Sequence, residues 1–166
     1  IDTSTTGIID ASSITTLTGT DSDKAIVRAS SGITGLLGGQ PPNSITITDQ
    51  TISASRLILL DAQYSGTVNA SSVNTISGTA ADLITAYTAN LAGTITGLGN
   101  EVVIVTDAAP PAASLNTING FTTGLVDVSA ATIVRGSAAD LVTAYSAKVA
   151  GAIVGLGNEP ITSYFC

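Results

Sequence analysis

Gly66–Glu101 reads GTVNASSVNTISGTAADLITAYTANLAGTITGLGNE, and Gly124–Glu159 reads GLVDVSAATIVRGSAADLVTAYSAKVAGAIVGLGNE. The two segments start 58 residues apart and are identical at more than half of their positions. A weaker third copy begins at Gly7 with GIIDASSITTLTGTDSD, about 59 residues before Gly66. Self-similarity at a fixed period is typical of repeat architectures, so this repeat decides the expected fold.

Each long repeat divides into two shorter units, and each unit has the pattern strand, strand, helix. The strand-like stretches are Val68–Val73, Thr75–Ser77, Thr94–Leu98 and Val102–Thr106, and the helical stretches are Ala80–Leu91 and Pro110–Phe121. We therefore expect six units, which start near Gly7, Gly32, Gly66, Gly93, Gly124 and Gly151. Glycine at each start fits a corner where the backbone turns sharply or takes a positive φ.

The six units define one domain over residues 7–166, preceded by a lead-in segment over residues 1–6. The second unit carries an insertion, Gly38–Asn43, which we expect to be a longer surface loop. In the last unit Pro160 stands where the earlier copy has Val102. Proline at an edge strand blocks further pairing, so Pro160 is a candidate cap of the array.

The helices have explicit start signals and apolar stripes. Thr79 and Asp82, Ser137 and Asp140, and Thr20 and Asp23 each have the spacing of a capping box, with Asp in place of the usual Glu. Two sets of residues at helical spacing are expected to face the core. These sets are Leu83, Ile84, Tyr87 and Leu91, and Leu141, Val142, Tyr145 and Val149. The shorter helices present Leu115, Ile118 and Phe121, and Leu57 and Leu60.

A strand of four or five residues is marginal alone, but it gains a parallel ladder when it stacks on the matching strand of the next unit. We therefore predict an α/β solenoid with short parallel strands and one helix per coil, in a geometry like that of leucine-rich repeats. The asparagine-ladder consensus of those repeats is absent. The alternative is a parallel β-solenoid with short helical corners.

Composition narrows the function classes. The chain has 166 residues, is 44% hydrophobic and 10% charged, and carries a formal charge of −7 with only five Lys and Arg. Nucleic acid is therefore not an expected partner, because phosphate binding needs a basic surface. No apolar run approaches the ~18 to 20 residues that span a bilayer. The abundant Ser and Thr are typical of secreted and surface proteins, so we expect an extracellular location.

Catalytic side chains are scarce. The chain has no histidine, which excludes the common Ser-His-Asp and Cys-His arrangements. Cys166, its single cysteine, is the last residue and has no neighbouring base in the sequence, so we expect an inert or linkage-prone thiol. Glu101 and Glu159 occupy equivalent positions after GLGN, and Asp21 and Asp23 flank a helix start. These positions favour turn and capping roles, so no catalytic, cofactor-binding or metal residue is predicted.

Two columns of aligned Asp and Asn residues are candidate calcium ligands. Asp10, Asn69 and Asp127 align in one column, and Asp49 and Asp107 align in another. If a column stacks, neighbouring oxygens hold a cation; the simpler interpretation is turn-capping through hydrogen bonds to the backbone. The expected cofactor is therefore none, with calcium as the minor alternative.

Surface recognition leaves further alternatives. Outward threonines on a solenoid bind ice, and Thr46, Thr48, Thr75 and Thr106 suggest such a row, which Arg135 interrupts. Asn69-Ala-Ser71 fits a glycosylation acceptor. A sugar-binding face would need aromatic side chains, and the candidates are Tyr64, Tyr87, Tyr145, Tyr164, Phe121 and Phe165. Tyr87 and Tyr145 are expected to be core residues.

The strings GTAADLITAYTA, ITGLGNE, VVIVTD and GTVNASSVNTISG resemble tandem repeats of very large secreted, adhesin-like surface proteins of cyanobacteria and other bacteria. The resemblance covers about residues 7–159 and is weaker in the first two units. It implies a cell-surface location and a structural, adhesive or motility-related role.

Together these observations predict a non-enzymatic extracellular repeat module that is structural or adhesive and assembles on a cell surface or in a filament. Its expected partners are copies of itself or other surface components. The alternatives are a glycan- or protein-binding surface module and, more remotely, an ice-binding protein.

Overall fold

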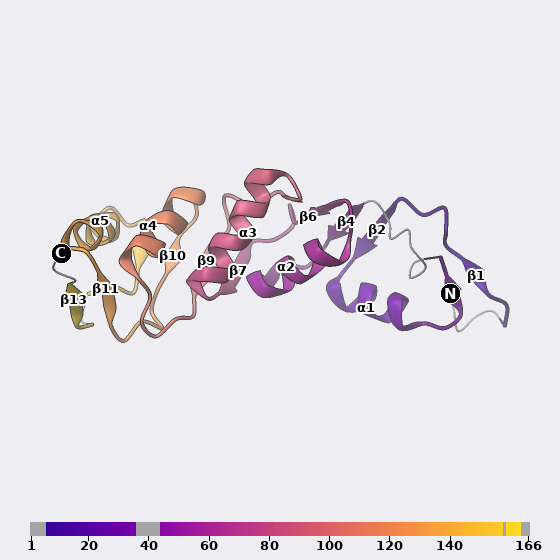
Figure 1. Ribbon diagram of the computed structural model, residues 1–166, viewed down its shortest axis with the longest axis horizontal. Helices are drawn as coiled ribbons and strands as arrows, with labels where there is room; N and C mark the ends of the chain where they lie inside the picture. Colours follow the sequence, from indigo (N-terminus) through magenta and orange to yellow (C-terminus); the bar gives the residue numbers. More distant parts are fainter. Residues whose placement is uncertain (1–5, 36–43, 158, 164–166) are drawn as a thin grey trace.

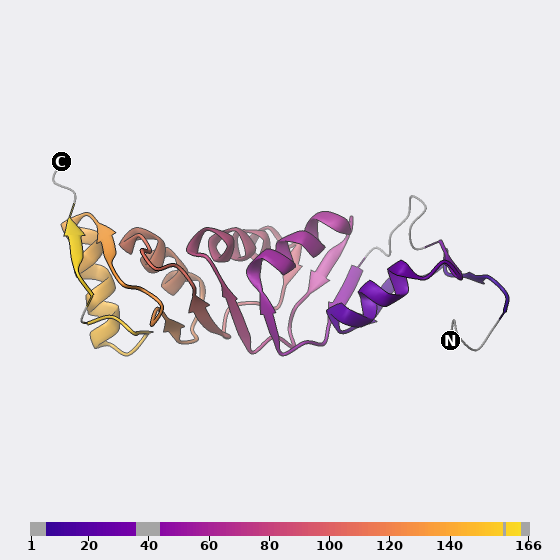
Figure 2. The same ribbon diagram turned by 90° about the horizontal axis from the view of Figure 1, so that it is seen from below.

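The computed structural model describes residues 6–35, 44–157 and 159–163. The expected surface loop at Gly38–Asn43, and Tyr164, Phe165 and Cys166, lie outside the described residues. The described part is an elongated α/β structure whose elements follow one another along the long axis in chain order (Figures 1 and 2). Its five helices are α1 (Asp21–Ala29), α2 (Ala54–Gln63), α3 (Ala80–Ala92), α4 (Ala112–Phe121) and α5 (Ala138–Val149). Helices α2 to α5 pack each against the next.

Every strand pair among the described residues is parallel. The sheets have the strand orders β2-β4-β6-β8, β12-β10-β9-β7-β5, β1-β3 and β11-β13. The strands are β1 (Ile9–Asp10), β2 (Thr16–Gly19), β3 (Ile33–Thr34), β4 (Ser44–Ile47), β5 (Thr51–Ser53), β6 (Thr67–Asn69), β7 (Thr75–Gly78), β8 (Ile95–Thr96), β9 (Val102–Val105), β10 (Val126–Asp127), β11 (Val134–Gly136), β12 (Ile153–Val154) and β13 (Ile161–Ser163). Parallel pairing requires a crossover between partners, and the helices supply much of it.

The pairing registers recur at the spacing of the sequence repeat. Val68 pairs with Ile95 between β6 and β8, and 58 residues later Val126 pairs with Ile153 between β10 and β12. In the same way Gly78 pairs with Val105, and Gly136 pairs with Ser163. Equivalent residues of the two long repeats therefore hold equivalent positions in the ladders.

The core is one apolar cluster whose buried members lie between Ile45 and Leu156, so it includes α2 to α5 but no residue of α1. Leu83 of α3 and Leu141 of α5 belong to this same cluster, together with the inward Ile and Val side chains of the strands. On β4 the inward residues are Ile45 and Ile47, which alternate with half-buried Ser44 and Thr46. Burying one such side chain contributes about 1.5–3 kcal/mol, so short strands become stable only as members of the row.

The predicted apolar stripes of the long helices are only partly right. Leu83 and Tyr87 are buried, but Leu91 is 72% exposed and its equivalent Val149 is 84% exposed. Leu91 is the next-to-last residue of α3 and Val149 is the last residue of α5, and both lie beyond the buried residues of their helices, which end at Tyr87 and Ala144. Ala80 and Ala86 complete the buried face of α3.

The predicted helix starts are confirmed, and the structure adds a second cap to two of them. The hydroxyls of Thr20, Thr79 and Ser137 each accept the backbone N–H three residues on. Asp49 accepts the first N–H of α1 at 2.8 Å, and Asp107 accepts the first N–H of α3 at 2.6 Å. These carboxylates come from the following unit, so each ties two neighbouring units together at the positive end of a helix.

Two expectations about corners need correction. The strand predicted over Val68–Val73 ends at Asn69, because the Asn69 side chain accepts the Ser71 N–H at 3.0 Å and closes a turn. Positive φ occurs at Gly93 and Gly151 but not at Gly124. At Gly124 the requirement is space instead, since an added Cβ would lie 2.0 Å from the Glu101 carbonyl oxygen.

Pro160 does not act as the cap that its position suggested. Its equivalent Val102 donates its N–H inward, to Asn74 of the preceding unit at 2.9 Å. The N–H that proline lacks is therefore one that would point back into the chain. The outward donor is the next residue, since Val103 donates to Leu125 of the following unit at 2.8 Å; Ile161 holds that place in the last unit.

Candidate functional site

A buried Tyr–Glu pair closes the GLGN corner of the fourth unit. Glu101 is 1% exposed, and one carboxylate oxygen accepts the Tyr87 hydroxyl. The other accepts the N–H groups of Gly99 at 2.8 Å and Asn100 at 3.1 Å. The Tyr87 ring stacks on Phe121 of α4 with ring centroids 5.5 Å apart. Glu101 thus has the geometry of a corner residue, as its repeated position indicated.

The same Tyr–Glu arrangement recurs one repeat later, where both side chains are more exposed to solvent. The Tyr145 hydroxyl donates to Glu159, and Glu159 accepts the Gly157 N–H at 2.8 Å. Both Tyr145 and Glu159 are half-buried, so the expectation of a core tyrosine holds fully only for Tyr87. Burial, reinforced by the bond to Glu159, raises the pKa of Tyr145 to about 12. Burial and the bond to Glu101 raise the pKa of Tyr87 further.

We expect these two tyrosines to make the fold alkali-sensitive. Their folded-state pKa values lie above the ordinary 10.0, so their contribution to stability is complete below pH 10 and is lost as the pH rises toward and past 12. Tyrosinate absorbance and circular dichroism, followed together against pH, measure this in a chain without tryptophan. Tyr145→Phe should remove one late-ionising group. Ionisation of every tyrosine near pH 10 in a folded chain would contradict the expectation.

The aspartate columns do not bring carboxylates together. Asp10, Asn69 and Asp127 each accept the backbone N–H two residues on, which is the turn-capping geometry. In the ladder, Asn69 lies between Thr46 and Thr96 rather than beside another column member. Asp49 and Asp107 bond to helix ends, as described above. Within the described residues, no group of three or more Cys, Asp or Glu side chains is placed to hold a metal ion.

The predicted threonine row is not one row. Thr46 lies on β4 of the four-stranded sheet, whereas Thr75 lies on β7 of the five-stranded sheet, and both side chains are half-buried. The ladder neighbours of Thr75 are Thr51 and Val102. A flat array of outward threonines, which ice binding needs, is therefore not formed by these residues.

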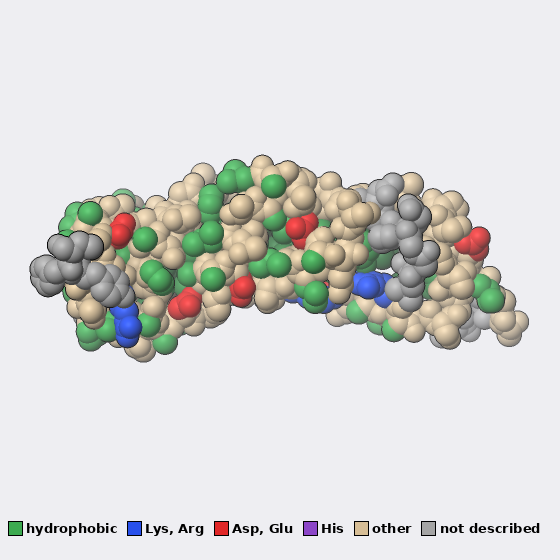
Figure 3. Space-filling view, viewed as in Figure 1, with side chains coloured by type: hydrophobic (Ala, Val, Ile, Leu, Met, Phe, Trp, Pro, Cys, Tyr) green, Lys and Arg blue, Asp and Glu red, His purple; other side chains and the backbone are tan. Residues whose placement is uncertain are grey.

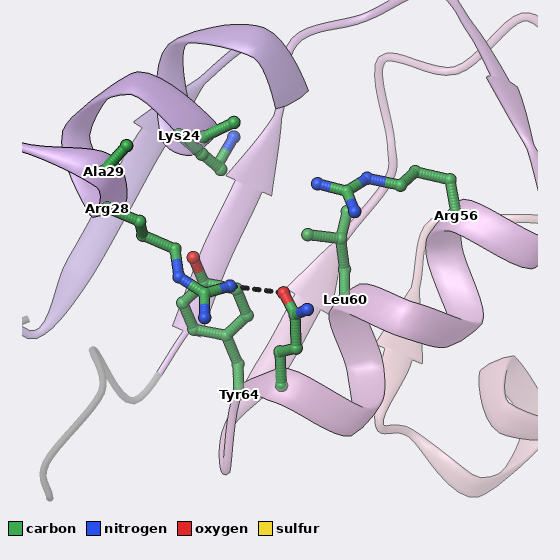
Figure 4. Close-up of a pocket in the computed structure, with 8 residues that line it drawn as sticks. Lys24, Arg28, Ala29, Arg56, Leu60 and Tyr64 are labelled. Carbon is green, nitrogen blue, oxygen red and sulfur yellow. Dashed lines mark hydrogen bonds between the residues drawn. The ribbon is translucent and has the colours of Figure 1, made fainter. Parts of the chain in front are cut away.

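Sequence reasoning missed a cleft between α1 and α2. Its volume is about 310 Å³, and its walls include Lys24 and Arg28 of α1 and Arg56 of α2 (Figure 4). Three of the chain's five basic residues thus line one hollow, and basic side chains gather over this region in Figure 3. Gln63 and Tyr64 complete the wall on the α2 side. The four-residue spacing of Lys24 and Arg28 was the one local signal for it.

Lys24 bonds to backbone carbonyl oxygens, and Arg56 bonds to a carboxylate. Lys24 is buried, and its ammonium donates to the carbonyl oxygens of Gly19 and, at 2.7 Å, Thr46. Burial lowers the pKa of Lys24. Arg56 forms a bidentate pair with Asp21 at 2.6 and 2.7 Å, and the hydrogen bond to Asp21 raises the pKa of Arg56. Asp21, expected to serve a helix start, thus also joins α1 to α2.

Arg28, the third cation of the cleft, bonds to a neutral side chain. Its guanidinium donates to the neutral side-chain amide of Gln63 and lies 5.6 Å from the centre of the Tyr64 ring. In the part of the chain that the structure describes, no carboxylate forms an ion pair with Arg28. The Tyr64 hydroxyl is buried without a hydrogen-bond partner. The cleft therefore offers a cation beside an aromatic ring, whose hydroxyl is buried.

Comparisons with protein-family models, with curated proteins and with solved structures found no match to this chain. No helix in the described ranges combines the length and the apolar character needed to cross a membrane.

Proposed function

We propose that the chain is an α/β solenoid of about six coils, starting near residues 7, 32, 66, 93, 124 and 151. We propose that it serves as a non-enzymatic structural or adhesive module outside the cell and assembles with copies of itself. The recurrence of the ladder registers at 58 residues supports the solenoid. Helices of 9 to 13 residues favour it over a β-solenoid with short helical corners.

Strand β13 is the main support for assembly. Strand β9 pairs on both sides, with β7 and with β10. Its equivalent β13 pairs with β11 and, among the described residues, with no strand on its other side. Ile161 at the place of buried Val103 is 58% exposed. An open parallel edge with an apolar side chain is a template for another strand.

Composition and the bonding of the carboxylates support an extracellular location and a non-enzymatic role. The Ser- and Thr-rich composition and the resemblance to secreted bacterial repeats favour a surface location. The carboxylates that sequence analysis singled out bond to helix ends and corners, at Asp49, Asp107 and Glu101. Groups held in this way serve the fold and are poor general acids or bases.

Sedimentation velocity over a wide concentration range tests assembly. We expect the chain to associate as its concentration rises, and we expect Ile161→Lys to abolish association by charging the edge of β13. Leu91→Lys is the control, because Leu91 is a 72% exposed apolar residue on α3, away from both ends of the molecule (Figure 1). A monomer at every concentration, or equal loss in both variants, would refute the proposal.

The cleft favours a second candidate function, the binding of acidic glycans on the cell surface. The main support is Arg28, whose guanidinium donates to the neutral side-chain amide of Gln63 in a cleft that Tyr64 also lines. The carboxylate of a uronic acid matches a guanidinium, and a sugar ring fits a cleft of about 310 Å³.

Titration calorimetry with a uronic acid oligosaccharide and its neutral analogue tests this candidate. We expect binding of the acidic sugar only, and an affinity at least about tenfold lower in Arg28→Gln, because a charge-assisted hydrogen bond contributes about 1.5–3 kcal/mol. Arg135→Gln, which changes a cation on β11, should bind like the parent. Equal affinity for the neutral sugar, or no binding of either sugar, would exclude the candidate.

A further inference from the structure

Helices α3 and α5 are equivalent in the repeat, but only α3 is followed by a helix within the described residues. Helix α4 packs against α3, and Phe121 at its end stacks on Tyr87. Under this cover Tyr87 and its partner Glu101 are each 1% exposed, and Ile84 is half-buried. The pair α3 and α4 therefore shows how the chain covers a helix of this kind.

The equivalent residues of α5 are consistently more exposed. Val142, the equivalent of Ile84, is 66% exposed. Tyr145 and Glu159, the equivalents of Tyr87 and Glu101, are half-buried. All three differences have the same sign, and Tyr145 is the equivalent of the residue that Phe121 of α4 covers on α3. They identify one uncovered contact surface on α5.

A hollow of about 410 Å³ marks this surface, lined by Val142, Tyr145, Ser146 and Val149. Its far edge is not part of the expected contact. Val149 is the equivalent of Leu91, which stays 72% exposed although α4 packs on α3. A helix in the hollow therefore contacts Val142 and Tyr145 and leaves Val149 in solvent.

We infer that this face of α5 binds an amphipathic helix of the α4 kind, with apolar residues at three-residue spacing and an aromatic ring that stacks on Tyr145. The properties of the expected partner are those of α4. Leu115 and Ile118 are buried, Phe121 stacks on Tyr87, and the helix sequence AASLNTINGF has no charged residue. The inference rests on the proposed stacking of coils and names the kind of helix that covers α5.

A graft tests the inference in the full chain. Ser163 is the equivalent of Val105, so residues 164–166 are replaced by a copy of Thr106–Thr123. We expect the melting temperature to rise by several degrees, and the pKa of Tyr145, read from tyrosinate absorbance, to rise above about 12 toward that of Tyr87. A graft in which the copied Phe121 is replaced by alanine should lose most of both effects.

Two surface variants locate the contact. Val142→Asp should leave the parent's melting temperature nearly unchanged, because the side chain is exposed, but should remove the gain from the graft. Val149→Asp should leave that gain intact. A graft that changes neither the melting temperature nor Tyr145 overturns the inference, as does protection of Tyr145 by self-association of the ungrafted parent, which would make a second copy the occupant. Self-association is measured separately, by sedimentation of the Ile161→Lys variant. The assembly proposal and the inference about α5 can therefore fail independently.

Discussion

Replacing Glu101 by alanine is expected to lower the free energy of unfolding by about 3–5 kcal/mol. The carboxylate accepts the Tyr87 hydroxyl and the N–H groups of Gly99 and Asn100. Its loss leaves three donors without an acceptor in a site that is almost closed to water, and each such group costs about 1–3 kcal/mol. Denaturant unfolding followed by circular dichroism measures the change.

The repeat supplies the matched control for this prediction. Glu159→Ala removes the equivalent carboxylate, but Glu159 and Tyr145 are half-buried, so water replaces much of what is lost. We expect a loss of about 1 kcal/mol, the ordinary net value of a hydrogen bond. Tyr87→Phe should likewise cost less than Glu101→Ala, because the two N–H groups keep their acceptor. Equal losses at positions 101 and 159 would show that burial does not set the cost.

Replacing Gly97 by alanine is expected to cost about 2–5 kcal/mol. Gly97 has a φ of +88°, and an added Cβ would lie 2.6 Å from the Ser71 nitrogen and 2.7 Å from the Ser71 Cα. The left-handed conformation costs alanine about 1–2 kcal/mol. Overlap with backbone atoms of the preceding unit adds about 1–3 kcal/mol, because the two corners must separate. Denaturant unfolding again gives the value.

Two glycines separate these contributions. Gly93 has a φ of +83° and nothing within 4 Å of an added Cβ, so Gly93→Ala should show only the conformational cost. Gly120 lies inside α4 with equally open space, so Gly120→Ala should stabilise the chain by up to about 1 kcal/mol. If Gly93→Ala and Gly97→Ala cost the same, close packing of the corners is not what makes Gly97 necessary.

Local signals predicted much of the fold from the sequence. The hydroxyl and the carboxylate three residues on placed the starts of α3 and α5 correctly, because a helix cap uses only neighbouring residues. The strand-like stretch Thr75–Ser77 likewise predicted β7 to within one residue. The apolar face of α3 was partly wrong at Leu91, since the sequence pattern does not show how far the neighbouring strands reach along the helix.

The cleft shows why the candidate site was not predicted. Arg56 and Asp21 are 35 residues apart, as are Arg28 and Gln63, yet both pairs are in contact. Each residue alone has the appearance of a solvated surface charge. Only the packing of α1 beside α2 converts them into the lining of one hollow, and no local pattern encodes that juxtaposition.

By itself, the sequence determined the order of strands and helices, the positions of the helix starts and the 58-residue period, because caps, turns and hydrophobic periodicity depend on residues close in the chain. Tertiary structure alone decided which residues become ladder neighbours. It placed Asn69 between Thr46 and Thr96 instead of beside Asp10 or Asp127. It also decided which tyrosine is covered, since Tyr87 and Tyr145 have nearly the same local sequence and differ in what packs against them.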